Sequence, residues 1–145
     1  SGEDIVNGRW ENEAAAEQLD SCAAIIFGTP TYMGSVSGQL KSFFDAMAPR
    51  WFTQKWRNKI ASGFTASSLA SGDKLSAFYA MSTFAMQMGM IWVGTGVSFS
   101  DGMNANGFYL GAGATASTPD QLKEIDLKTA AFLASRVVEF ADRLN

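Results

Sequence analysis

The chain has 145 residues, the usual size of one domain, and we expect residues 1–145 to form a single domain around one core. Its 47% hydrophobic and 17% charged residues are ordinary for a globular protein and argue against a disordered chain. A net charge of −3, without a run of Lys or Arg, excludes a nucleic-acid binder. No apolar stretch approaches the length of a transmembrane helix, so we expect no integral membrane segment.

The sequence contains no histidine and a single cysteine, Cys22. The lack of histidine excludes Ser-His-Asp and Cys-His catalysis and the common zinc sites, and we expect no metal site. Any reaction must be performed by carboxylates, by hydroxyls or by a cofactor that brings its own reactivity. A lone cysteine excludes an internal disulfide and favours a reducing, cytoplasmic compartment. We expect Cys22 itself to begin a buried strand and to be inert.

The first half of the chain predicts a helix, a strand, a loop and a second helix. Residues 12–22 are rich in strong helix formers. The apolar run AAIIFG at 23–28 predicts a parallel strand covered on both faces. The segment Gly-Thr-Pro-Thr that follows predicts a loop. Apolar residues three and four apart then predict a helix over 37–47, with Ser37 as its N-cap.

The second half repeats this alternation. Residues 59–66 predict another buried strand, residues 74–89 a helix, and residues 90–96 a third apolar strand. The Gly/Asn-rich stretch 101–120 predicts a long loop. An amphipathic C-terminal helix is expected to start at Thr118–Pro119.

Alternating strands and helices predict right-handed crossovers and an open parallel sheet with helices on both faces. In such sheets ligands bind beyond the carboxyl ends of the strands. We therefore expect the loops after Phe27, Phe64 and Val93 to converge on one edge. Backbone amides and hydroxyl groups there suit a ligand that bears phosphate or polar ring atoms.

Three blocks of the sequence carry a resemblance to a known family: AAIIFGTPTYMGSVSGQLKSFFDAM, KIASGFTASS and MGMIWVG. From about Asp20 to Gly96 the chain resembles the flavodoxin-like NAD(P)H:quinone oxidoreductases of the tryptophan-repressor-binding-protein type, and more broadly the FMN-dependent NAD(P)H reductases. The resemblance implies an α/β fold, a flavodoxin-like three-layer sandwich with a parallel sheet and FMN at its carboxyl edge. It also implies NADH or NADPH as electron donor, a quinone or other small acceptor, and a homo-dimer or homo-tetramer.

The same resemblance implies which residues form the site. The family's Thr-Pro-Thr-x-x-Gly flavin loop falls on 29–34 and its next flavin loop on 66–71. Gln87 lies where many relatives have the first of two histidines, and Trp51 where an aromatic residue stacks on substrate over a neighbouring subunit's flavin. The implied cofactor contacts are Pro30, Thr31, Tyr32, Met33, Gly34, Ala66, Ser67, Ser68, Leu69, Ala70, Ser71 and Gln87, and the implied substrate contacts are Trp51 and Tyr109.

The front of the chain departs from the family pattern. In the family a strand, a phosphate-binding loop, a helix and a second strand precede the segment equivalent to 23–28. Residues 1–22 are too few to supply them, so we expect a domain truncated at its N-terminus, or one that obtains these elements from elsewhere. The strand at 23–28 would then keep an unpaired edge, and the flavin phosphate would lose its main anchor.

Two alternatives to an enzyme stay open. A flavodoxin-type electron carrier would surround its flavin loops with carboxylates, whereas the sequence leads us to expect Lys41, Arg50, Lys55 and Arg57 near them. A flavin-free assembly module of the same fold is suggested by the absent phosphate loop. Bound flavin would exclude the module, and rapid NAD(P)H oxidation with an added quinone would disfavour the carrier.

Overall fold

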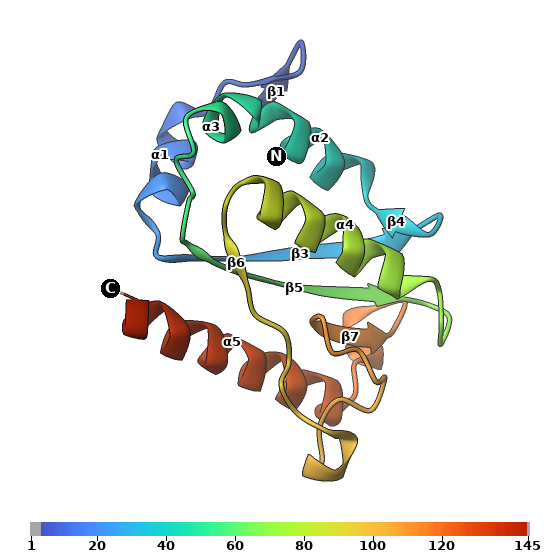
Figure 1. Ribbon diagram of the computed structural model, residues 1–145. Coiled ribbons are helices and arrows are strands. Elements are labelled where there is room, and N and C mark those ends of the chain that lie inside the picture. The colour runs from blue at the N-terminus through green and yellow to red at the C-terminus, as the bar shows by residue number, and fades with distance from the viewer. Residues whose placement is uncertain (1–3, 145) are drawn as a thin grey trace.

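The computed structural model describes residues 4–144, and its helices and strands alternate along the chain (Figure 1). Short 3-10 helices at Phe99–Asp101 and Pro119–Gln121 interrupt the loops. The elements in chain order are β1 (Ile5–Val6), β2 (Arg9–Trp10), α1 (Glu13–Ser21), β3 (Ala24–Tyr32), β4 (Ser35–Val36), α2 (Gly38–Ala46), α3 (Ala48–Phe52), β5 (Ile60–Ser67), α4 (Lys74–Gln87), β6 (Ile91–Trp92), β7 (Ala112–Thr115) and α5 (Glu124–Leu144).

A mostly parallel sheet forms the middle layer. β3 pairs in parallel with β5, and both β6 and β7 pair in parallel with the other side of β5. In Figure 1, α2 and α4 cover one face of the sheet and α5 lies across the other. This is the flavodoxin-like α/β arrangement predicted from the alternation of elements. Among the described residues, no helix is both long and apolar enough to cross a membrane.

The last strand of the sheet is divided in two. β6 pairs with the start of β5 at Ile60–Ala61, and β7 pairs with its end at Phe64–Ser67. The segment 93–111 leaves the sheet between them and is fastened where Trp92 Nε1 donates to the carbonyl of Leu110 at 2.8 Å. The predicted strand over 90–96 is therefore too long, and the predicted loop over 101–120 is wrong where it contains β7.

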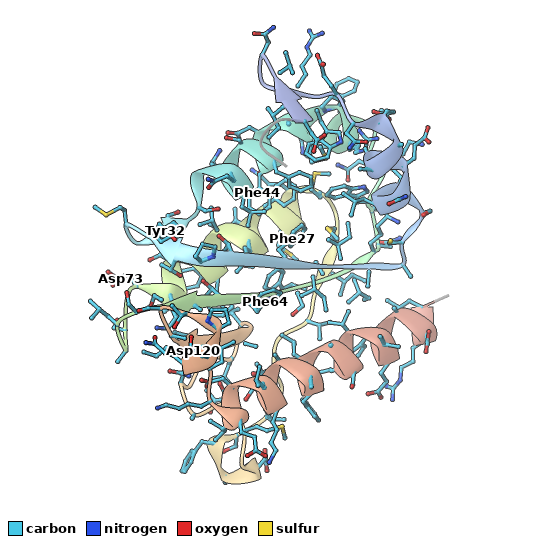
Figure 2. The ribbon with its side chains drawn as sticks, turned by 180° about the vertical axis from the view of Figure 1, so that it is seen from behind. Phe27, Tyr32, Phe44, Phe64, Asp73 and Asp120 are labelled. Carbon is cyan, nitrogen blue, oxygen red and sulfur yellow. The ribbon has the colours of Figure 1, made fainter. Side chains whose placement is uncertain are left out.

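Aromatic rings fill the core between the sheet and the α2–α4 layer. Phe44 of α2 and Phe84 of α4 stack with centroids 3.9 Å apart, and Phe27 of β3 meets both edge-on. Figure 2 labels Phe27 on β3 and Phe44 on the helix above it. The predicted apolar face of α2 is confirmed by this contact. Ser37 is confirmed as the N-cap of α2, since its side chain accepts from the amide of Leu40.

A buried ion pair ties α1 to α3. Asp20 accepts hydrogen bonds from Arg50 Nε at 3.0 Å and from Trp56 Nε1 at 2.7 Å. Burial raises the pKa of Asp20, but these hydrogen bonds and the charges of Arg50 and Lys55 outweigh it and hold the pKa below its ordinary value. Arg50 also pairs with Glu13 at 2.7 Å, so one guanidinium joins both ends of α1 to the core.

β3 extends further than its apolar run. It continues through Thr29, Pro30 and Thr31 to Tyr32, turns at Met33–Gly34 and returns as β4. Both turn residues have positive φ, 47° and 72°, as a two-residue hairpin loop of the primed type requires. The predicted loop after residue 28 is therefore a strand and a tight turn.

The remaining differences concern cover and boundaries. Side chains on β3 alternate between buried and exposed, so the predicted cover on both faces is wrong at Ile26, which is 37% exposed. Among residues 4–144, positions 24–30 of β3 pair with another strand on one side only. Cys22 is exposed, not buried as predicted, because it caps α1 before the strand begins. The C-terminal helix begins at Glu124, after the 3-10 turn that Pro119 opens.

Candidate functional site

The carboxyl ends of β3, β5 and β7 meet at one rim of the sheet. A pocket of about 480 Å³ opens there, within the usual size range of small-molecule sites. Thr31 and Ser67 both line it, as the convergence of the strand ends predicts. The third contribution comes from the segment after β7, whereas the sequence predicted the loop after Val93. We call this the rim pocket; its lining residues are Pro30, Thr31, Tyr32, Ala66, Ser67, Ser68, Ala116, Ser117, Thr118, Pro119 and Leu122.

A pair of hydroxyl groups supports the wall of the rim pocket. Thr31 Oγ1 lies 2.7 Å from Thr65 Oγ1, and both side chains are buried. Either oxygen can be the donor. If Thr65 donates, the proton of Thr31 stays available for a ligand, so the pair can present either a donor or an acceptor to the pocket.

The loop after β5 is folded over a buried side chain. Ser67 Oγ donates to the carbonyl of Leu69 at 3.0 Å and accepts from Lys74 Nζ at 2.8 Å. The backbone of Ser67 in turn accepts from the amide of Ala116 at 3.0 Å, which ties this loop to the segment after β7. Two walls of the pocket are thereby fixed to each other.

The other predicted residues of the two flavin loops lie beside the pocket, not in its lining. Met33 and Gly34 form the hairpin turn after Tyr32. Leu69, Ala70 and Ser71 belong to the loop held by Lys74, and the side chain of Leu69 is exposed.

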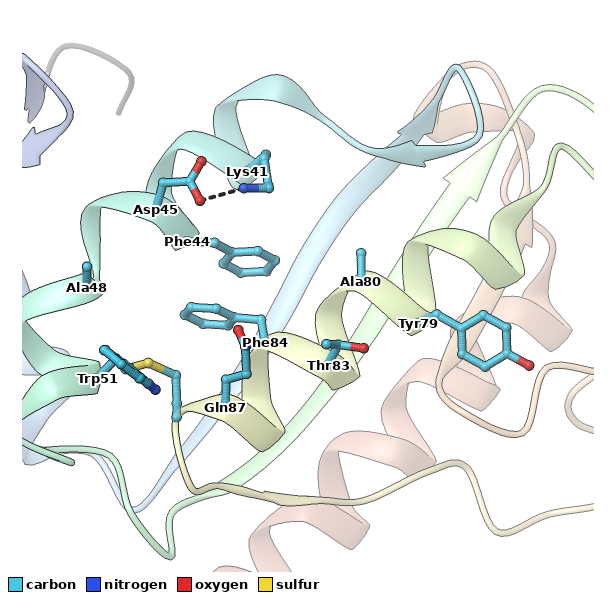
Figure 3. A pocket seen from close by; sticks show the side chains of 11 residues that line it. Lys41, Phe44, Asp45, Ala48, Trp51, Tyr79, Ala80, Thr83, Phe84 and Gln87 are labelled. Atoms are coloured by element: carbon cyan, nitrogen blue, oxygen red, sulfur yellow. Dashed lines mark hydrogen bonds and ion pairs between the residues drawn. The ribbon is translucent and has the colours of Figure 1, made fainter.

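Gln87 and Trp51 lie together in a second cavity, between α2, α3 and α4 (Figure 3). Its volume is about 580 Å³, and its aromatic lining residues besides Trp51 are Phe44, Phe84 and Tyr79. We call it the helix-layer pocket. Tyr109 lies in neither pocket; its carbonyl accepts from the amide of Thr95 and its ring is exposed. The structure thus brings most predicted cofactor residues to one rim and separates them from Gln87, Trp51 and Tyr109.

The segment before β7 is anchored below the sheet. The backbone amide of Asn104 donates to Thr129 Oγ1 at 2.7 Å, and Asn106 Nδ2 donates to Asp126 Oδ1 at 2.8 Å. These bonds fix the segment to α5.

Comparison with known proteins identifies the family. The family model described as NADPH-dependent FMN reductase matches residues 4–104. The chain belongs to this family. It is 37% identical over 143 residues to the flavodoxin FldP of Pseudomonas aeruginosa. This match covers 92% of this chain and 78% of that protein. It is 34% identical over 131 residues to an NAD(P)H dehydrogenase (quinone) of Archaeoglobus fulgidus. This match covers 90% of this chain and 65% of that protein.

A solved structure supports the same assignment for this FMN reductase family member. The crystal structure of the flavodoxin, WrbA-like protein from Agrobacterium tumefaciens superposes with a TM-score of 0.77 at 36% identity, over 95% of this chain and 77% of that one. The resemblance read from the sequence is therefore confirmed. The family places the chain among oxidoreductases that use FMN and NAD(P)H.

The rim pocket fits the ring end of FMN. Its lining includes the hydroxyl of Thr31, the small side chains of Ala66 and Ser68, and the exposed ring of Tyr32. This mixture of polar and apolar groups suits a flat heteroaromatic ligand. Among the described residues, the lining of the rim pocket includes no lysine or arginine that could pair with a phosphate. The fit is thus to the ring of the flavin.

The charges near the rim differ from the expectation. Lys55 and Arg57 line a separate cavity at the amino ends of the strands, and Arg50 is buried against α1. Figure 2 instead shows Asp73 and Asp120 at the same end of the molecule as Tyr32. Lys41 lies on α2 in the helix-layer pocket and pairs with Asp45. The prediction that basic residues surround the flavin loops is wrong for Arg50, Lys55 and Arg57, because their segment runs back to the start of β5.

Sequence reasoning missed Thr65, Lys74 and the stretch 116–119. Thr65 was foreseeable, since alternation along β5 places it on the same face as Ser67. The stretch 116–119 was not, because it reaches the rim only through the pairing of β7 with β5.

Proposed function

We propose that the rim pocket binds the isoalloxazine ring of FMN and that the protein passes electrons from NADH or NADPH to a quinone or a similar small acceptor. The observation that carries this proposal is the convergence of Thr31, Ser67 and Thr118 on one pocket. Membership of the NADPH-dependent FMN reductase family supports the cofactor. The quinone is supported by the relatives named NAD(P)H dehydrogenase (quinone).

In this proposal the protein positions the flavin and the flavin supplies the electron-transfer chemistry. Thr31 donates to or accepts from a polar ring atom, in the direction that its bond to Thr65 leaves free. Tyr32 and Pro30 border the ring on one side, and the Ser67–Ser68 backbone borders it on the other. Met33, Gly34 and the residues from Leu69 to Ser71 support these two borders from behind.

Trp51 is proposed to contact substrate over a neighbouring subunit's flavin in a homo-dimer or homo-tetramer, and Gln87, in the same pocket, is proposed to hydrogen-bond that flavin. The helix-layer pocket is apolar and open, and Trp51 is half-exposed at its edge beside the exposed Phe52. Burial of such aromatic surface favours association. Tyr109 is a further candidate for substrate contact, and a cytoplasmic location remains part of this proposal.

The test is flavin binding followed by turnover. The purified protein is titrated with FMN and with riboflavin, with flavin fluorescence as the signal, and then supplied with NADH or NADPH and 1,4-benzoquinone. We expect saturable binding of both flavins, because the ring makes the assigned contacts, and quinone-dependent NAD(P)H oxidation. Thr31→Val should weaken flavin binding about tenfold, whereas Ser135→Ala, exposed on α5 and outside both pockets, should leave it unchanged. No binding of either flavin would refute the proposal.

A flavodoxin-type electron carrier is the second candidate, because two observations favour it. The chain resembles the flavodoxin FldP at 37% identity, and Asp73 and Asp120 lie at the same end of the molecule as Tyr32, while Lys55 and Arg57 line a separate cavity. A carrier would bind FMN but oxidise NAD(P)H only when a separate reductase is added. Direct oxidation by the purified protein would exclude it.

A further inference from the structure

Lys74, the first residue of α4, is a completely buried lysine whose charge is fully hydrogen-bonded. Its Nζ donates to Ser67 Oγ at 2.8 Å, to the carbonyl of Leu69 at 2.8 Å and to the carbonyl of Ala70 at 3.0 Å. Three acceptors require three N–H donors, which only the protonated ammonium has. The geometry therefore describes a buried positive charge.

The surroundings of Lys74 affect its charge in two opposite ways. Burial holds the pKa of Lys74 below its ordinary value, and the carboxylate of Asp126 offsets only part of this lowering. Asp126 is itself buried and is held in place by Asn106, and the ring of Phe108 lies 5.9 Å from Lys74 Nζ. A negative charge and an aromatic face thus stabilise the ammonium in a site that water does not reach.

The three acceptors of Lys74 belong to the loop that walls the rim pocket. Ser67 lines the pocket itself, so the ammonium lies one hydrogen bond behind the wall. Leu69 and Ala70 offer backbone carbonyls, which means that the side chain of Lys74 holds the path of the main chain. Among the described residues, Lys74 is the only charged side chain hydrogen-bonded to this loop.

We propose that Lys74 is a positioning residue of the flavin site: it fixes the loop from Ser67 to Ala70 against the ring and places a positive charge beneath it. The proposal rests on the proposed function. Reduction adds negative charge to a flavin, so a buried ammonium near the ring favours the reduced form. Lys74 then acts through Ser67 on affinity and through its charge on the reduction potential.

Lys74→Met tests both roles, with Lys128→Met on the exposed part of α5 as the matched control. In the flavin-free protein, K74M should speed hydrogen exchange of the Ala116 amide and of the amide at position 74, which donate to the carbonyls of Ser67 and Ser71 in this loop, by about tenfold or more and leave those of β5 unchanged. K74M should also weaken FMN binding about tenfold or more and move the midpoint potential of bound FMN to a more negative value. K128M should change none of these quantities.

Ser67→Ala separates the two roles and remains informative if K74M fails to fold. S67A removes one acceptor but keeps the ammonium, so it should loosen the loop and weaken FMN binding while shifting the potential less than K74M. If K74M changes neither FMN binding nor the midpoint potential, the role of Lys74 is overturned, while the proposed function stands. Equal potential shifts in S67A and K74M would overturn the charge effect. An unsubstituted protein that binds no flavin would overturn the proposed function and with it the flavin role of Lys74.

Discussion

Replacing Thr65 with valine removes one hydroxyl of the buried pair behind the rim pocket without changing the shape of the side chain. The two Oγ1 atoms are 2.7 Å apart, and Thr65 and Thr31 are only 2% and 7% exposed, so the hydroxyl that a single substitution leaves behind has little access to water. The hydrogen bond contributes about 1 kcal/mol, and an unpaired buried hydroxyl costs about 1–3 kcal/mol. We therefore expect T65V, and likewise T31V, to lower the free energy of unfolding by about 1–3 kcal/mol.

The double variant T31V/T65V decides whether the pair behaves as one unit. With both hydroxyls gone nothing is left unpaired, so its cost should be smaller than the sum of the single costs by about 1 kcal/mol or more. Urea unfolding of the four proteins, followed by tryptophan fluorescence, measures this difference. Additive costs, within about 0.5 kcal/mol, would refute the reasoning because each hydroxyl would then have another partner. Thr83→Val, exposed on α4, should stay within about 0.5 kcal/mol of the unsubstituted protein.

Two further predictions concern the scaffold of the site. Arg50→Met should destabilise the protein by about 3 kcal/mol at pH 7, because it leaves Asp20 without its buried partner, whereas Lys41→Met on the surface should cost under about 1 kcal/mol. Because the pKa of Asp20 is lowered on folding, its carboxylate contributes in full above about pH 4 and loses its contribution as the pH falls through the lowered pKa. The gap between R50M and the unsubstituted protein in urea unfolding should therefore narrow at low pH, and a constant gap would contradict this. Gly34→Ala should lower the melting temperature, at a cost of about 1 kcal/mol, because its φ is +72°, while Gly38→Ala, with open space in the first turn of α2, should raise it. The same sign of change in both variants would refute this assignment of the turn.

The sequence was informative where apolar periodicity is strong. Phe43 and Phe44 predicted the buried face of α2, and the continuous apolar run at the start of β5 predicted its burial. The sequence misled at Pro30, which was interpreted as the beginning of a loop. A proline is tolerated in a strand where no neighbour needs its N–H, and among residues 4–144 Pro30 is paired only with β5. β3 therefore continues for two more residues before its hairpin turn.

β7 could not be predicted from hydrophobic pattern, because its residues are small. The reason lies in packing: a Cβ added to the adjacent Gly111 would lie 2.2 Å from the carbonyl oxygen of Gly63 and 2.4 Å from the ring of Phe78. The chain must approach β5 this closely for β7 to pair, so small residues are required where the pattern predicts a loop. The third wall of the rim pocket depends on this pairing.

Two walls of the rim pocket could be predicted from the sequence, but the contacts of Lys74 behind them could not. Thr31 and Ser67 follow from the rule that strands end at a common rim. Lys74 could not be predicted in this way, because a lysine at the start of a helix is usually solvated. The neighbouring sequence gives no sign that three acceptors are buried around it. Its three hydrogen bonds become visible only in the structure, where the loop from Ser67 to Ala70 folds around it.

The divided last strand has a consequence for the behaviour of the protein at high concentration. An unpaired strand of full length is a template on which a strand of another molecule can grow by backbone hydrogen bonding. Here that side of the sheet presents two residues of β6 and four of β7, separated by a segment that Trp92 and Leu110 hold in place. Such short pieces are poor templates, so the interruption protects this border against intermolecular sheet growth.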